Sequence, residues 1–233
     1  MKIYGLQKLT LLDYPGLVAC TIFTGGCNFR CPFCHNALLV TRLEESKNGV
    51  MEEEEVLSFL KKRVGLLDGV CITGGEPLMQ KDLTQFIEKV RLLGFKIKLD
   101  TNGSYPEKLK ELLEKGLLDY VAMDIKNSPD RYAETCGLDI FNVEHIKESV
   151  EILKNSGVNH EFRTTVVKEF HDRKSFEDVG KWLSGEDKYY IQNFKDSGNL
   201  IKEGLRGFSK DELNEFLSVV KKFIPGAELR EVE

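Results

Sequence analysis

Residues 17–36 read Leu-Val-Ala-Cys-Thr-Ile-Phe-Thr-Gly-Gly-Cys-Asn-Phe-Arg-Cys-Pro-Phe-Cys-His-Asn, and this stretch sets the expected fold. Its first part, residues 17–23, is apolar and rich in β-branched side chains, which is typical of a buried β-strand. Gly25 and Gly26 end that run, and a loop with three cysteines follows directly. The stretch therefore predicts a strand that carries a chemically active loop at its carboxyl end.

The alternation of short apolar runs with amphipathic stretches continues along the whole chain. Apolar residues recur at helical spacing after most of the runs, and Ser209 with Glu212 forms a capping box before a last helix at about 209–224. The further runs that read as strands are residues 70–73, 95–99, 120–125, 162–167 and 189–192. Six strand–helix pairs with short links predict an α/β fold with a parallel sheet, either partly closed into a barrel or open and doubly wound.

The remaining stretches and the overall composition constrain the organisation. Residues 36–49 and 127–141 lack periodicity, so loops or irregular structure are expected there. The 233 residues, with 41% hydrophobic and 30% charged side chains, fit a single globular domain over 1–233. A net charge of −5 argues against a dedicated nucleic-acid binder. Neither a secretory pattern nor a membrane-spanning run is visible, so we expect no membrane association and a cytoplasmic location, where thiols stay reduced.

Three cysteines in the loop, Cys27, Cys31 and Cys34, have the spacing C-x3-C-x2-C. Thiolates suit iron–sulfur clusters, and three ligands for a four-iron cluster leave one iron without a protein ligand. An open coordination position is typical of catalytic metal sites. A zinc site that adds His35 is an alternative, but two adjacent ligands are awkward for one tetrahedral ion, and a disulfide is less favoured still.

The other cysteines are candidates for a fourth ligand. Cys20 and Cys71 lie inside predicted strands, where a small buried cysteine usually packs in the core. Cys136 falls in the irregular segment 127–141 and stays ambiguous, with no role in the cluster as the favoured interpretation.

The loop, with aromatic Phe33 just before its third cysteine, resembles the signature of the radical S-adenosylmethionine (SAM) superfamily. Residues 9–16, Leu-Thr-Leu-Leu-Asp-Tyr-Pro-Gly, together with residues 21–36 resemble the anaerobic ribonucleoside-triphosphate reductase activating proteins. Those are glycyl-radical activases related to pyruvate formate-lyase activating enzyme. The resemblance implies a partial (β/α)6 barrel with a [4Fe–4S] cluster on the three cysteines. It also places Phe33 and His35 beside the cofactors.

The resemblance further assigns polar residues at strand ends to SAM. Residues 73–77 read Thr-Gly-Gly-Glu-Pro, and the family's Gly-Gly-Glu-Pro element contacts the methionyl amino group, which implicates Gly74, Gly75 and Glu76. The other implied contacts are Asp100, Thr101, Asp124, Lys126 and Arg163, and Asp100 and Asp124 are additionally implied ligands of a monovalent cation.

Residue patterns alone add two points about these charges. Asp124 and Lys126 alternate with apolar neighbours, so both point to one face of their strand and should pair with each other or with a ligand. Arg163 could instead face solvent. His145, His160 and His171 read as surface or structural histidines, and Lys195 is not favoured as a cavity residue.

The implied reaction is reductive cleavage of SAM to methionine and a 5′-deoxyadenosyl radical. That radical would take a hydrogen atom from a glycine of the large subunit of an anaerobic ribonucleoside-triphosphate reductase. A flavodoxin or ferredoxin would supply the electron. Two alternatives stay open: a radical SAM enzyme that acts on pyruvate formate-lyase or on a small molecule, and a non-catalytic zinc or electron-transfer module.

Overall fold

The computed structural model describes residues 1–41, 43, 49–196 and 198–230. All the strands expected from the apolar runs are present and lie parallel to one another, in chain order, within one sheet. They are β2 (Ala19–Thr24), β4 (Gly69–Gly74), β5 (Lys96–Thr101), β6 (Tyr120–Asp124), β7 (Asn159–Val166) and β8 (Tyr189–Asn193). The predicted parallel α/β sheet is therefore confirmed.

Three further strands were not predicted. β1 (Lys2–Thr10) and β3 (Met51–Glu52) extend the sheet antiparallel beyond β2, and β9 (Glu228–Arg230) pairs parallel with β8. β1 carries polar Gln7 and Lys8, and the other two strands are only two and three residues long, so none shows a clear apolar run. The order β3-β1-β2-β4-β5-β6-β7-β8-β9 has two free edges, so the sheet is an open partial barrel.

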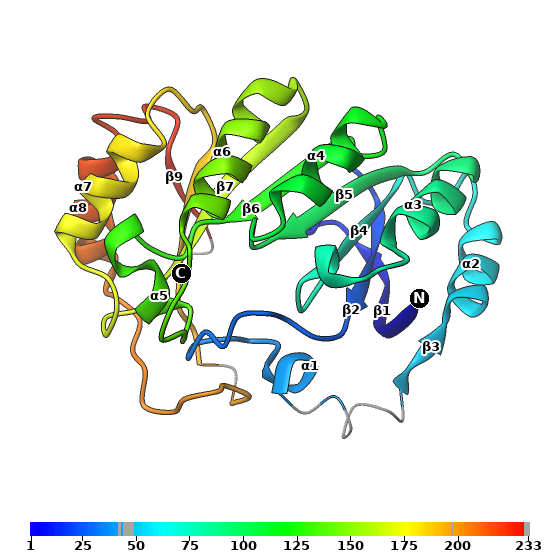
Figure 1. Cartoon of the computed structure of the whole chain (residues 1–233), viewed down its shortest axis with the longest axis horizontal. Helices are drawn as coiled ribbons and strands as arrows, with labels where there is room; N and C mark the ends of the chain where they lie inside the picture. The colour runs from blue at the N-terminus through cyan, green and yellow to red at the C-terminus, as the bar shows by residue number, and fades with distance from the viewer. Residues whose placement is uncertain (42, 44–48, 197, 231–233) are drawn as a thin grey trace.

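Helices cover the outer side of the curved sheet, as Figure 1 shows. The expected ones are α2 (Glu53–Lys61), α3 (Leu83–Leu92), α4 (Pro106–Glu114), α6 (Glu144–Ser156), α7 (Arg173–Trp182) and α8 (Lys210–Val220). The Ser209–Glu212 capping box of α8 is formed as predicted. Two short helices, α1 (Ala37–Thr41) and α5 (Tyr132–Thr135), lie in stretches that were expected to be irregular. Part of the first stretch, at 42 and 44–48, lies outside the described residues.

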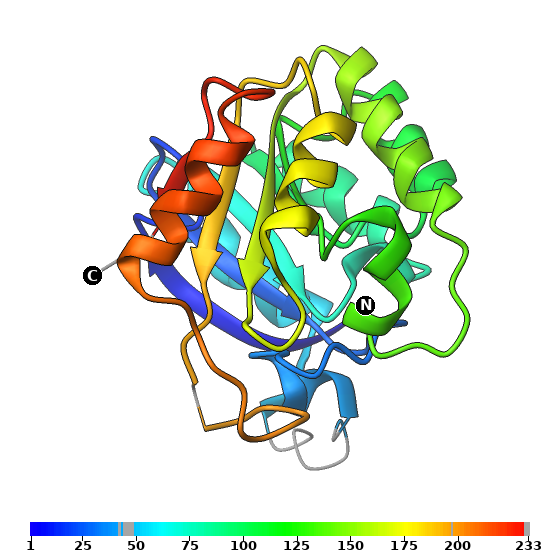
Figure 2. The ribbon, with the colours of Figure 1, turned by 90° about the vertical axis from the view of Figure 1, so that its left-hand side faces the viewer.

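Each outer helix is held to the sheet by one apolar stripe. In α3 the stripe consists of Leu83, Phe86, Ile87 and Val90, all at most 1% exposed. Burying one such side chain contributes about 2 kcal/mol, so this stripe outweighs the modest helix propensity of a ten-residue segment. Figure 2 shows the parallel strands running beneath these helices with their carboxyl ends at the same side of the sheet.

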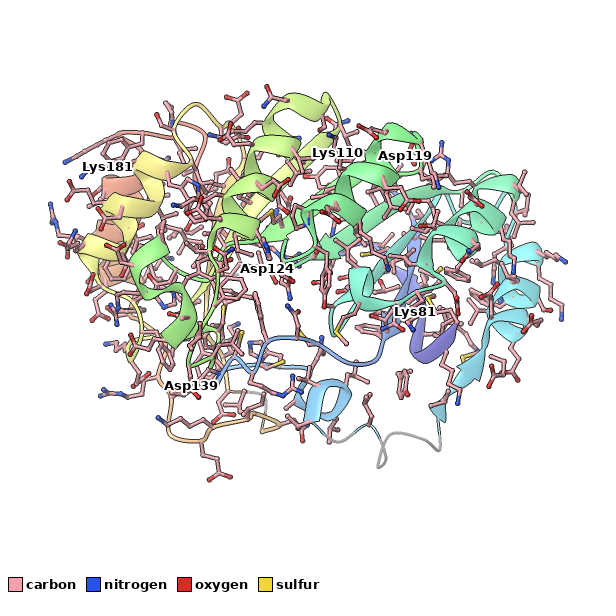
Figure 3. The ribbon with its side chains drawn as sticks, in the orientation of Figure 1. Lys81, Lys110, Asp119, Asp124, Asp139 and Lys181 are labelled. Carbon is pink, nitrogen blue, oxygen red and sulfur yellow. The ribbon has the colours of Figure 1, made fainter. Side chains whose placement is uncertain are left out.

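The inner side of the sheet carries charged side chains such as Asp124, unlike the apolar contacts that hold the outer helices. Figure 3 labels Asp124 within the arch of the sheet, whereas the labelled Lys110 and Lys181 project from outer helices. The loop between β2 and α1 crosses this inner side (Figure 1). Among the described residues, no helix combines the length and the apolar character that a membrane span needs.

Candidate active site

The three cysteines of the loop after β2 line a single cavity at the carboxyl ends of the parallel strands. Cys31 is buried, whereas Cys27 and Cys34 are half-buried. The same cavity is lined by Phe33, His35, Gly74, Gly75, Asp100, Thr101, Asp124, Lys126 and Arg163. Of the residues predicted from the sequence to hold cofactors, all but Glu76 are thus brought together by the fold.

Close backbone contact explains the glycines beside the cysteines. Gly26 has a φ of 85°, a conformation that favours glycine. A Cβ on Gly75 would lie 1.8 Å from the Gly26 carbonyl oxygen, and one on Gly74 would lie 2.3 Å from the Thr24 carbonyl oxygen. The amide of Glu76 donates to Gly26 O at 2.8 Å, so β4 and the cysteine loop are joined where no side chain fits. Because Cys27 directly follows Gly26, this junction also fixes the position of Cys27.

The Glu76 carboxylate does not line the cavity in this structure, and its predicted contact with SAM stays a prediction. The side chain is 0% exposed and accepts hydrogen bonds from Leu78 N (3.0 Å), Thr101 Oγ1 (2.7 Å) and Asn102 N (2.7 Å). Burial raises its pKa to about 7, and the three donors act in the opposite direction. The carboxylate ties the end of β4 to the end of β5, so only the backbone of this turn is left to face the cavity.

A chain of ion pairs forms the inner wall of the cavity. Arg163 lies between two carboxylates, with Nη2 3.0 Å from Asp100 Oδ2 and Nε 2.5 Å from Asp124 Oδ1. Lys126 Nζ is 2.9 Å from Asp124 Oδ2, and Lys98 pairs with the other oxygen of Asp100. Arg163 is therefore not a solvent-facing residue, and the expected pairing of Asp124 with Lys126 is confirmed.

The electrostatics of this wall follow from its composition. Burial works against charge on both carboxylates, but Arg163, with Lys98 at one end and Lys126 at the other, holds the pKa values of Asp100 and Asp124 below their usual range. Two cations, Lys126 and Arg163, face two anions, Asp100 and Asp124, where the wall lines the cavity, so these charges balance there. The implied monovalent cation stays a prediction, and it would share the two carboxylates with Lys and Arg, because all four oxygens already accept one hydrogen bond from these side chains.

Burial shields the thiols of the cysteine loop from water. Burial raises the pKa of Cys27 to about 12 and also raises that of Cys34, while Lys126 acts to lower both. Cys27 Sγ accepts from Phe29 N at 3.3 Å and from Asn102 Nδ2 at 3.7 Å. The sequence resemblance also implies that the strand end Asp100–Gly103, which includes Asn102, lines the cavity, but it did not predict the contact of Asn102 with Cys27. A bound cation or cluster would supply the positive charge that these buried thiolates need.

The donor set fits a multi-iron cluster better than a single ion. Across the part of the chain that the structure describes, no three His, Cys, Asp or Glu side chains lie close enough together to hold one metal ion. Sulfurs around one zinc each lie about 2.3 Å from it, hence within about 4 Å of one another. Three soft sulfur donors on one loop suit an iron–sulfur cluster.

Aromatic side chains from distant segments enclose the cysteine loop. Phe33 is 3% exposed, and its ring lies 5.9 Å from that of Phe170. His35 lies 5.7 Å from the ring of Phe194. Lys195, which was considered as a cavity residue, is exposed and does not line the cavity. The loop is thus held between the segments that follow β7 and β8.

The cysteines outside the loop are placed as expected in two of three cases. Cys20 and Cys71 are fully buried in β2 and β4 and do not line the cavity, which confirms their core role. Cys136 is also fully buried, but its carbonyl oxygen accepts from the amide of Arg30, the residue before Cys31, at 2.9 Å. All six cysteines are free thiols.

His171 proves to be a structural residue of the site. It is 4% exposed, its Nδ1 accepts from Val167 N at 3.1 Å, and its Nε2–H donates to the Lys126 carbonyl oxygen at 2.8 Å. This bond anchors the backbone that carries Lys126. Its ring also lies 6.5 Å from that of Phe33, so it braces two predicted cofactor residues at once.

His171 should make the protein sensitive to acid. Burial lowers its pKa from 6.5 to about 4, so between these values the unfolded chain takes up a proton that the folded chain excludes. The stabilising contribution is complete above pH 6.5 and is lost as pH falls toward 4, by up to about 3 kcal/mol. Denaturant unfolding at several pH values should show a smaller loss in His171→Asn than in the unmutated protein. The exposed His145→Asn is the control, and equal acid sensitivity in all three proteins would contradict the assignment.

Comparison with known proteins adds three findings. Residues 21–183 match the family model described as the Radical SAM superfamily. A protein of Methanocaldococcus jannaschii, provisionally described as a glycyl-radical enzyme activating enzyme, is 34% identical over 236 residues, which cover 98% of this chain and 95% of that protein. A protein of Saccharolobus solfataricus, provisionally described as a GTP 3′,8-cyclase, is 30% identical over 135 residues, which cover 55% of this chain and 42% of that protein.

Among solved structures, Streptococcus suis SuiB bound to S-adenosylmethionine has a TM-score of 0.69 to this chain at 14% identity. The match covers 89% of this chain and 48% of that one, so this chain spans about half the length of SuiB. At this identity the likeness concerns the fold alone, and it agrees with the open partial barrel described above.

Proposed function

This chain belongs to the radical SAM superfamily, and we propose that it generates a glycyl radical on an anaerobic ribonucleoside-triphosphate reductase, with residues 1–233 acting as one radical SAM domain. Members of the superfamily use a [4Fe–4S] cluster and SAM. The observation that carries the proposal is the shared cavity, where three cysteine thiols meet an ion-paired wall of strand-end residues. The near full-length likeness to a provisional glycyl-radical activase supports the choice of reaction.

In this proposal Cys27, Cys31 and Cys34 would hold the cluster through three of its irons, which would leave one iron without a protein ligand and free for SAM. When bound, the cluster supplies the electron that cleaves the sulfonium–C5′ bond, giving methionine and a 5′-deoxyadenosyl radical that takes a hydrogen atom from the target. The backbone carbonyls of the turn at Gly74 and Gly75 are the acceptors proposed for the SAM amino group. Lys126 and Arg163, the two cationic side chains of the cavity wall, are the groups proposed to face the SAM carboxylate.

The remaining predicted contacts have supporting roles in this proposal. Phe33 and His35 bound the cavity beside the third cysteine, and Thr101 fixes Glu76 while lining the same space. Enclosure by these side chains keeps water and stray hydrogen donors from a reactive radical.

A second cavity supports a polypeptide as the substrate. It is lined by Leu11, Leu12, Asp13 and Pro15 from the activase-like segment 9–16, and it shares Asp100 and Arg163 with the first cavity. Leu11 and Leu12 are 69% and 86% exposed, and neighbouring exposed leucines are typical of a surface that another protein covers. We propose that the target protein docks against this surface, and that a flavodoxin or ferredoxin supplies the electron at the cluster.

The decisive experiment uses electron paramagnetic resonance (EPR). The reconstituted, reduced protein is incubated anaerobically with SAM and the large subunit of the reductase. A glycyl doublet is expected, and it should be absent when the target glycine is replaced by alanine. A doublet formed only on pyruvate formate-lyase would identify that enzyme as the target in place of the reductase. Release of 5′-deoxyadenosine without any protein radical would refute the activase assignment and favour a small-molecule substrate, which the partial likeness to the cyclase supports.

A further inference from the structure

The side chain of Asn102, in the loop after β5, faces the sulfur of the first loop cysteine. Asn102 is 6% exposed and lines the same cavity as Cys27. Its Nδ2 lies 3.7 Å from Cys27 Sγ and 3.0 Å from Asn28 Oδ1. Because a primary amide carries two N–H groups, Asn102 can donate to both acceptors at once.

The two ends of the Asn102 amide are distinguished by their partners. The backbone N–H of Ser104 donates to Asn102 Oδ1 at 2.9 Å, and the Ser104 hydroxyl donates to the same oxygen at 2.5 Å. A backbone N–H can only donate, so the end of the amide that faces it must be the carbonyl oxygen. The NH2 end is therefore turned toward Cys27, since the reversed amide would set two donors against each other at Ser104.

Further hydrogen bonds hold Asn102 in place. Its backbone N donates to Glu76 Oε2 at 2.7 Å, which ties it to the turn after β4. Asn28 Nδ2 donates to Ser104 Oγ at 2.9 Å, so the side chains of Asn28, Ser104 and Asn102 form a closed ring. Because Asn28 directly follows Cys27, the ring joins the cysteine loop to the end of β5. Of its three members, Asn102 is the one that lines the cysteine cavity.

The Cys27 sulfur thus has two N–H donors of different origin. The amide of Phe29, 3.3 Å from Cys27 Sγ, belongs to the cysteine loop itself. Asn102 comes from a separate strand end, so its donor can be removed by substitution without altering the sequence of the loop. A negative sulfur is costly in buried surroundings, and each donor that faces it lowers that cost.

We propose that Asn102 is a positioning residue whose side-chain N–H donates to the Cys27 sulfur and raises the reduction potential of the bound cluster. Reduction adds one electron, supplied by the flavodoxin or ferredoxin, and part of that charge falls on the sulfur ligands. The N–H dipole stabilises the more negative reduced state more than the oxidised one. A side-chain amide neither gains nor loses a proton in this role.

The inference rests on the proposed binding of a cluster by the three loop cysteines, and not on the identity of the target protein. The effect should be that of one hydrogen bond to a partly negative acceptor. Because the cluster must be reduced before SAM is cleaved, Asn102 would make that first step easier for a given electron donor.

The first test is an EPR-monitored redox titration of the full-length, reconstituted protein without SAM or target. In Asn102→Leu, which is similar in size and has no donor, the ratio of reduced to oxidised cluster at a fixed solution potential near the midpoint is expected to fall about threefold to tenfold. Ser104→Ala is the matched control, because it removes a hydroxyl from the same ring but leaves the N–H that faces Cys27. Its ratio should stay within about twofold of that of the unmutated protein.

The second test detects the hydrogen bond itself. Pulsed EPR of the reduced protein, prepared with asparagine that carries 15N in its side-chain amide, should show a weak 15N coupling to the cluster. The coupling should persist in Ser104→Ala and disappear in Asn102→Leu. If Asn102→Leu does not fold, Asn102→Asp carries both tests, because it lacks the N–H but keeps the oxygen to which Ser104 N donates.

Three results would overturn the proposal: an unchanged ratio in the residue-102 variant, an equal fall in Ser104→Ala, or a 15N signal that the residue-102 variant does not change. Each of these requires a cluster to be present and leaves the target-protein experiment unaffected. An unmutated protein that takes up no iron and sulfide would instead refute the proposed function, and this inference with it.

Discussion

Replacing Cys34 with alanine is expected to abolish cluster binding, with iron and sulfide falling to background and the visible absorbance lost. The loop offers three thiols to the cavity, so the variant would leave two of four irons without a protein ligand. Neither of the fully buried strand cysteines can compensate, because Cys20 and Cys71 do not line the cavity. SAM cleavage should fall to the rate of the uncatalysed reaction, measured as 5′-deoxyadenosine formed.

Cys20→Ala is the suitable control, because it removes a buried thiol from β2, the strand that leads into the loop. It should retain the full cluster and lose only the stability expected for a small core truncation, about 1 kcal/mol. Iron content that is equal in Cys34→Ala and Cys20→Ala would mean that the cluster is not held by this loop.

Replacing Gly75 with alanine is expected to have the largest effect of any single methyl group added near the site. The new Cβ would lie 1.8 Å from the Gly26 carbonyl oxygen, and this contact is with backbone that no side-chain rotation can relieve. We expect the free energy of unfolding to fall by about 3 kcal/mol, the upper part of the range for overpacking. Because Gly26 precedes Cys27, the displacement should also weaken cluster binding, measured by iron content after reconstitution.

Gly49→Ala provides the comparison, since no heavy atom lies within 4 Å of its added Cβ. Chemical denaturation should place this variant within about 0.5 kcal/mol of the unmutated protein. If Gly75→Ala were equally stable and bound the cluster fully, the close approach of the two backbones could not be what holds the loop in place.

Most of the fold could be predicted because buried parallel strands leave a strong local pattern. The runs that became β2 and β4 are apolar throughout, since both faces of a parallel strand are covered. β9 could not be predicted, because its three residues are positioned by contacts with residues far away in the chain. One of these contacts is the ion pair of Arg230 with buried Glu161 at 2.7 Å. Whether the sheet closes into a barrel could not be predicted from the sequence either, because closure depends on which edge strands pair.

The candidate site likewise has features that could be predicted from local sequence and features that could not. The spacing of Cys27, Cys31 and Cys34 is local, so it could be read directly, and polar residues at strand ends pointed to the same cavity. The orientation of the Glu76 carboxylate could not be read, because its donors come from a different strand end. The placement of Cys136 and His171 beside the site could not be predicted for a related reason, because each approaches the site from a segment far away in the chain.

The central claim is that one iron of the cluster has no protein ligand and binds SAM directly. Electron–nuclear double resonance on the reduced enzyme, with SAM carrying 15N in its amino group and 17O in its carboxylate, tests this most directly. Hyperfine coupling from both labels to the cluster is expected, and it should be lost when labelled SAM is replaced by unlabelled SAM. A cluster spectrum that is unchanged by SAM and shows neither coupling would rule out direct binding of SAM to the cluster.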